Sequence, residues 1–163
     1  MIHDDIEVLS SLAQVAVAFA GFSAIVVLFR RNDTGRWYKV HRDRFHGMVV
    51  HATAAVFFCL LPMLVGLASR DAATIWDVSS VLLGIQITVH VTGVLVMGTT
   101  SGASRFVVAI GYLFVVLQAL NVAGIGFDHE ARPYVAGVIW HVIQSGALFV
   151  GLIWVPSSEV EGK

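Results

Sequence analysis

Eight amide and imidazole side chains stand in stretches of the sequence that are otherwise almost wholly apolar. They are Gln14, His51, Gln86, His90, Gln118, Asn121, His141 and Gln144. Amides both donate and accept hydrogen bonds, and imidazoles can also bind metals or exchange protons near neutral pH. Because polar groups are costly to bury among apolar ones, this set supplies the first candidates for a functional site.

The spacing of these residues follows helical periodicity. Three pairs lie three or four positions apart: Gln86 with His90, Gln118 with Asn121, and His141 with Gln144. Such pairs project from one face of a helix. If the midpoint of each apolar stretch marks the bilayer centre, the glutamines of the three pairs share one level, with the remaining members above and below it. The sequence therefore predicts a polar pathway across a membrane.

The elements that would position these residues are five apolar stretches. The chain has 163 residues, of which 57% are hydrophobic and only 13% charged. About 20 apolar helical residues cross a bilayer core of about 30 Å, and helices satisfy every backbone polar group there. The predicted spans are 6–29, 45–68, 75–98, 106–127 and 134–155, with a basic connector at 30–44. We expect one all-α domain over 1–163, a polytopic membrane helix bundle.

The distribution of basic residues predicts the orientation. The first connector is rich in Arg and Lys, and such loops stay in the cytoplasm. The N-terminus is then outside and the C-terminus inside. The first residues are acidic, unlike a secretory signal, so the first apolar stretch is expected to remain as a span. We expect an integral protein of a bacterial inner membrane.

The basic connector also suggests contacts with lipid. Asp33 and Thr34 are suited to cap a helix that begins near Gly35 and runs into the second span. The residues expected to contact anionic headgroups are Arg36, Trp37, Lys39, Arg42 and Arg44. The alternative is that these residues only set the topology. Nucleic-acid binding is not expected, because the cluster is short and lies against the membrane.

Two features concern the packing of the helices. Pro62 falls inside the second span, where it should kink the helix and leave the carbonyl of Phe58 without its helical donor. Ala16, Ala20 and Ala24 form a small-residue face on the first span. Such a face suits tight helix contact within one protomer or in a homo-oligomer, and we expect a homo-oligomer.

The residue types favour passive conduction over chemistry. No Asp or Glu lies inside the predicted spans, and no nucleophile–base set, phosphate loop or close histidine pair is recognisable. We therefore expect no enzyme, no metal and no cofactor. Coupled carriers commonly use buried carboxylates, so a passive ion channel or pore subunit, made pH-sensitive by its histidines, is the favoured function.

Two other functions stay open. His51 and His90 lie at similar depth and could be the axial ligands of haem b in an electron-transfer subunit, although His141 has no counterpart at its own predicted depth. The protein could also be a structural or accessory subunit. In that case the polar residues would only hold helices together.

Overall fold

The computed structural model describes the backbone of residues 2–34, 39–96 and 102–154, and the side chains of 4–28, 42–96 and 105–154. In this part of the chain there are five helices: α1 (Ile2–Thr34), α2 (Lys39–Ala68), α3 (Ala72–Val96), α4 (Gly102–Val122) and α5 (Ala131–Ile153). Each is long and apolar enough to cross a membrane. The predicted all-α class, with five helices of membrane-spanning length, is confirmed, and it is compatible with an integral membrane protein.

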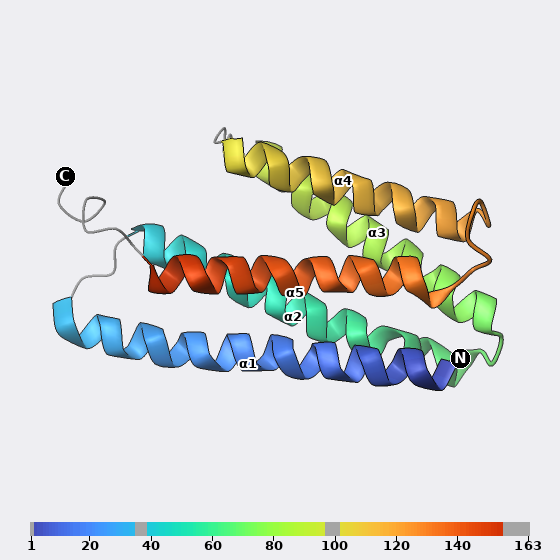
Figure 1. Ribbon diagram of the computed structural model, residues 1–163, viewed down its shortest axis with the longest axis horizontal. Coiled ribbons are helices and arrows are strands. Elements are labelled where there is room, and N and C mark those ends of the chain that lie inside the picture. Colours follow the sequence, from blue (N-terminus) through green and yellow to red (C-terminus); the bar gives the residue numbers. More distant parts are fainter. Residues whose placement is uncertain (1, 35–38, 97–101, 155–163) are drawn as a thin grey trace.

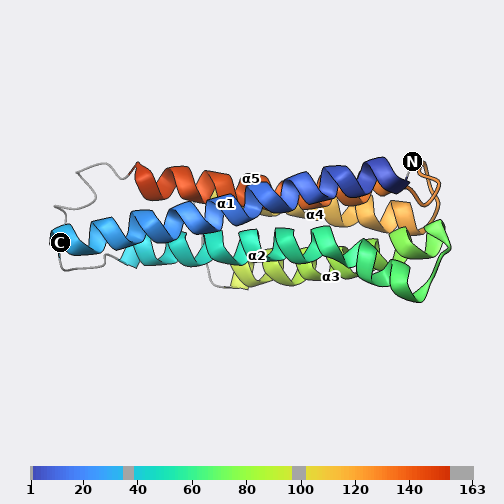
Figure 2. The same cartoon turned by 90° about the horizontal axis from the view of Figure 1, so that it is seen from below.

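Helix α5 occupies the middle of the bundle. It contacts each of the other four helices, and the α3–α4 pair lies on the opposite side of it from α1 (Figures 1 and 2). Successive helices run antiparallel, so the start of α1 and the end of α5 lie at opposite ends of the bundle (Figure 1). This arrangement lets α5 carry side chains that meet partners from several helices.

All five helices begin three to six residues before the predicted spans, and the ends of α1 and α4 each differ from the predicted ends by five residues. Helix α1 continues to Thr34, so the cap predicted at Asp33 and Thr34 is wrong; Asn, Asp and Thr are only moderately poor helix formers, and a helix that is already formed can continue through them. Helix α4 ends at Val122 instead of 127. Gly124 and Gly126 follow it with φ of 65° and 73°, a left-handed conformation that glycine adopts readily and that ends helices.

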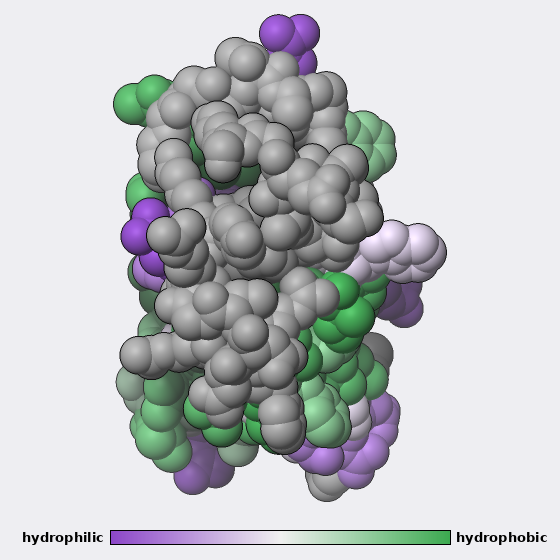
Figure 3. Space-filling model, turned by 90° about the vertical axis from the view of Figure 1, so that its left-hand side faces the viewer, coloured by the Kyte–Doolittle hydropathy of each residue, from purple (hydrophilic) through white to green (hydrophobic). Residues whose placement is uncertain are grey.

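The outer surface of the bundle is apolar on every helix. Large exposed hydrophobic side chains include Val17, Leu67, Val89, Leu113 and Ile143, one from each helix in turn. In the end-on view of Figure 3, hydrophobic and hydrophilic residues both appear around the end at which α1 finishes. An apolar surface of this kind suits contact with lipid chains.

The small-residue face of α1 is used partly inside the protomer. Ala16 is fully buried and packs with Ala55 of α2 and Val142 of α5, whereas Ala24 is exposed. Small side chains allow helix backbones to approach closely. Close packing of α1 against α2 and α5 therefore accounts for at least one alanine of the face.

Pro62 lies inside α2, which continues through it to Ala68. A proline has no N–H, so the carbonyl of Phe58 loses its usual helical donor, as the sequence predicts. The hydroxyl of Tyr134, a fully buried side chain of α5, donates to this carbonyl instead. The carbonyl that Pro62 leaves without a helical donor is thus satisfied by a hydrogen bond that joins α2 to α5.

Replacing Tyr134 by Phe should lower the free energy of unfolding by about 2 kcal/mol, because the buried Phe58 carbonyl is then left without a donor. The cost should be smaller in a Pro62→Ala background, where residue 62 regains an N–H for that carbonyl. Unfolding of the purified protein in detergent, followed by circular dichroism for the four members of this cycle, measures both values. Equal costs in the two backgrounds would contradict the assignment.

Asp71 caps the start of α3. Its Oδ2 accepts hydrogen bonds from the Thr74 hydroxyl at 2.6 Å and from the Thr74 backbone N–H at 2.9 Å. These bonds stabilise the carboxylate and lower the pKa of Asp71 below its ordinary value of 3.8. The bond from the Thr74 hydroxyl has the larger effect, and the bond from the Thr74 N–H comes second. The side chain is fully exposed, so the cap acts locally at the end of the helix.

The stabilisation from this cap should be present above the ordinary pKa and should disappear as the pH falls through the lowered pKa of Asp71. Thr74→Val removes the hydroxyl bond and should move the pKa of Asp71 back toward 3.8. Titration of the carboxyl carbon by NMR in detergent micelles gives the value for each protein. A pKa unaffected by Thr74→Val would show that the hydroxyl bond does not form.

Candidate functional site

Three of the eight predicted polar residues meet in one cluster, which consists of His51 from α2, His90 from α3 and His141 from α5. The Nδ1 atoms of His51 and His141 lie 3.1 Å apart, within hydrogen-bonding distance. The rings of His51 and His90 meet edge to face, with 4.5 Å between their centroids. The structure thus brings together three imidazoles that are far apart in the sequence.

The cluster is shielded by the bundle. His141 is fully buried, His51 is 4% exposed and His90 is half-buried. For the bond to form, one Nδ1 must carry a proton while the other presents a lone pair, so the two rings hold different tautomers. The remaining ring nitrogen of His141, Nε2, is buried and has no hydrogen-bond partner among the described residues. Each of its tautomers therefore leaves one buried polar group unsatisfied.

Two bonds between α2 and α5 flank the cluster. On one side, the hydroxyl of Ser145, one turn beyond His141, donates to the carbonyl of Met48 at 3.3 Å. On the other side, two turns away, Tyr134 donates to the carbonyl of Phe58. Because both bonds join the same two helices, they fix the register that sets His51 opposite His141.

The three glutamines that lie on α1, α3 and α5 differ in how deeply they are buried. Gln86 lies one turn from His90 on α3 and is half-buried, with an Oε1 that is buried and has no partner among the described residues. Gln144 is half-buried on α5. Gln14 lies on the exposed side of α1, so the structure does not bring it together with the histidines.

Gln118 and Asn121 of α4 bind the backbone at the start of α5. Gln118 donates through Nε2 to the carbonyl of Pro133 at 2.7 Å. Asn121 donates to the carbonyl of Glu130 and accepts from its N–H, both at 3.0 Å, and also donates to the hydroxyl of Ser80 on α3. Both side chains are almost fully buried. These two amides hold the α4–α5 loop in place.

These contacts correct the depth order inferred from span midpoints. Gln118 touches Pro133, and Gln144 lies eleven residues further along α5, about 16 Å at 1.5 Å per residue, so the three glutamines do not share one level. The expectation that no histidine lies at the depth of His141 is also wrong, since His141 forms a hydrogen bond with His51. The midpoint rule failed because the helices differ in length and are displaced along the bundle.

The geometry also bears on metal and haem binding. In the three side-chain ranges that the structure describes, no group of three His, Cys, Asp or Glu residues is arranged to hold a metal ion. An iron with two axial histidines lies between their rings. His51 and His90 touch each other directly, so haem binding between them would require this contact to open.

The predicted headgroup contacts are only partly described. Arg36 and Trp37, and the side chain of Lys39, lie outside the described residues. Arg42 is exposed, and its Nε lies 3.8 Å from Oδ1 of Asp43. Arg44 donates to the carbonyl of Gly151 at 2.7 Å, which ties the first part of α2 to the last turns of α5.

Comparison of the chain with protein-family models, with curated proteins and with solved structures gives no match. The site is therefore interpreted from its own geometry.

Replacing Asn121 by Ala should lower the free energy of unfolding by about 2 kcal/mol, because the N–H and carbonyl of Glu130 lose their partner. Gln14→Ala is the matched control, since Gln14 is an exposed amide with no hydrogen bond among the described side chains, and its cost should stay below about 0.5 kcal/mol. Denaturation of both variants in detergent provides the comparison. Similar losses for the two would refute a clamping role for Asn121.

Proposed function

We propose that this protein conducts protons passively across a membrane through the cluster of His51, His90 and His141. The observation that carries the proposal is the hydrogen bond between the Nδ1 atoms of His51 and His141, at 3.1 Å, inside a bundle of membrane-spanning length. An imidazole can accept a proton on one nitrogen and release one from the other. Linked imidazoles can therefore pass protons where no water-filled pore exists.

The contacts of the cluster favour protons over larger ions. The rings of His51 and His90 are in direct contact, which leaves no space between them for a hydrated ion. Of the amides predicted to line a pore, Gln118 and Asn121 are engaged with backbone groups, and Gln14 lies on the outside of the bundle. A proton needs only a chain of hydrogen bonds, and the histidines supply part of one.

Two buried groups support a pathway that extends beyond the three rings. Nε2 of His141 and Oε1 of Gln86 have no partner among the described residues. Buried polar atoms without partners are rare, and ordered water commonly satisfies them. Water at these two atoms would lengthen the chain of hydrogen bonds on either side of the histidines.

The predicted membrane frame belongs to the same proposal. A cytoplasmic position for the end of the bundle where α1 finishes and α2 begins is supported by the cluster of basic residues there, Arg30, Arg31, Arg36, Lys39, Arg42 and Arg44, and the simplest setting is a bacterial inner membrane. A homo-oligomer would use the outer side of α1 near Gly21, where an added Cβ would meet nothing within 4 Å.

The test is proton flux into liposomes that contain the purified protein and a pH-sensitive dye, driven by a potassium gradient with valinomycin. We expect flux from the wild type, and flux near that of protein-free liposomes from His51→Gln and His141→Gln. An amide keeps the hydrogen bond but cannot relay a proton at neutral pH. His46→Gln, an exposed histidine on the same helix, should conduct like the wild type.

Each alternative function predicts a different outcome of this experiment. An accessory subunit gives no flux from the wild type, and this result would overturn the proposal. A haem protein shows a strong visible absorption band that is lost in His51→Gln and His90→Gln. Circular dichroism and gel filtration of each variant separate loss of relay from loss of fold.

A further inference from the structure

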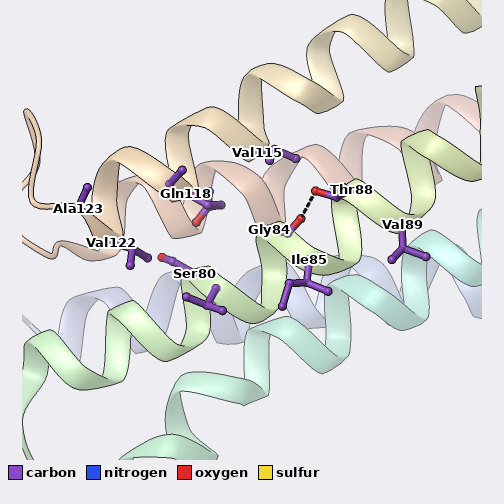
Figure 4. A pocket seen from close by; sticks show the side chains of 11 residues that line it. Ser80, Gly84, Ile85, Thr88, Val89, Val115, Gln118, Val122 and Ala123 are labelled. Carbon is purple, nitrogen blue, oxygen red and sulfur yellow. Dashed lines mark hydrogen bonds between the residues drawn. The ribbon is translucent and has the colours of Figure 1, made fainter.

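A groove between α3 and α4 lies on the membrane-facing side of the bundle. It has a volume of about 540 Å³. Its walls are apolar, and Val81, Ile85 and Val89 of α3 and Val115 and Ala119 of α4 line it. Figure 4 shows Ile85 and Val89 on one of the two helices and Val115 on the other. No histidine of the cluster lines it. A cavity of this size is large enough for a small organic molecule.

Gln118 lies at the floor of the groove with one end of its amide unsatisfied. The side chain is 2% exposed, and its Nε2 already donates to the carbonyl of Pro133. Its Oε1 is buried and has no hydrogen-bond partner among the described residues. Figure 4 shows this oxygen in the space between the two helices. The groove therefore presents an acceptor that needs a donor.

Ser80 supplies a complementary group from α3. Its hydroxyl oxygen accepts from Nδ2 of Asn121 at 3.1 Å, which leaves the hydroxyl proton able to point elsewhere. Thr88 is already engaged, since it donates to the carbonyl of Gly84 at 2.8 Å. The groove thus offers one acceptor and one donor on a floor between apolar walls.

We propose that this groove binds a membrane-soluble, mainly apolar molecule that carries a single hydroxyl group. The hydroxyl donates to Oε1 of Gln118 and accepts from Ser80, while the hydrocarbon part lies against the valine and isoleucine walls. Among the residues that the structure describes, no charged side chain lines the groove, so an ionised ligand has no counterpart there. A plain acyl chain would leave Oε1 of Gln118 unsatisfied. The site is independent of the histidine cluster.

The shape of the groove explains how such a molecule would enter. Val81, Ile85 and Val89 are exposed on the side that faces lipid, so entry is lateral from the bilayer. Gly84 leaves the floor open, and a Cβ there would already lie 3.4 Å from Cβ of Gln118. A larger side chain at Gly84 or at Ala119 would therefore occupy the space of the ligand.

The experiment is photolabelling of the full-length protein in liposomes with a hexadecanol analogue that carries a diazirine in its chain. We expect labelled peptides from α3 and α4, with labelling displaced by excess hexadecanol but not by its methyl ether, which has no donor. Equal displacement by the two compounds would mean that acyl chains fill the groove without recognition. Labelling spread evenly over all five helices would also overturn the proposal.

Ala119→Phe fills the groove from an exposed position and should reduce the labelling several-fold. Ala109→Phe is the matched control, because Ala109 is an exposed alanine of α4 that does not line the groove, and labelling should be unchanged. Equal labelling of the two variants would refute the location.

Gln118→Leu should abolish the preference for alcohol over ether. Proton flux should persist in Ala119→Phe, so the two proposals fail separately.

Discussion

Hydrogen bonds between side chains and backbone carbonyls hold α5 against its neighbours, and the rest of the bundle depends on them. Tyr134 and Ser145 donate from α5 to α2, Arg44 donates from α2 to the last turns of α5, and Gln118 donates from α4 to its first turn. In an apolar bundle a buried polar group without a partner is expensive, so each bond strongly favours one position of the helix. Since α5 contacts all four other helices, its position sets theirs.

The histidine cluster is a consequence of this register. The bonds of Tyr134 and Ser145 lie on either side of His141 along α5, and their acceptors lie on either side of His51 along α2. With both ends of the contact fixed, the two imidazoles meet at hydrogen-bonding distance. The same packing leaves Nε2 of His141 without a hydrogen-bond partner among the described residues. Rigid surroundings and a buried ring nitrogen able to form one more hydrogen bond are the features on which the proposed proton relay rests.

The fold was largely predictable, because runs of about 20 apolar residues have one stable form in a membrane. The end of α4 was missed because residues 123–127 are apolar apart from their glycines, and the left-handed turn at Gly124 and Gly126 outweighed composition. The three histidines were identified, but not the pairing of His51 with His141, which depends on how far helices are displaced along one another. Nothing in the sequence distinguishes an amide that lines a pathway from one that binds a carbonyl. Ser145 carries no signal either, since serine commonly bonds within its own helix.

The amide of Gln118 is planar and rigid, so its two ends move as one body. Its nitrogen holds the first turn of α5, the helix that carries His141, and its oxygen faces the groove between α3 and α4. Because the carbonyl of Pro133 holds the nitrogen, the direction in which the oxygen points is fixed as well. The acceptor in the groove is therefore oriented by the same hydrogen bond that holds the start of α5.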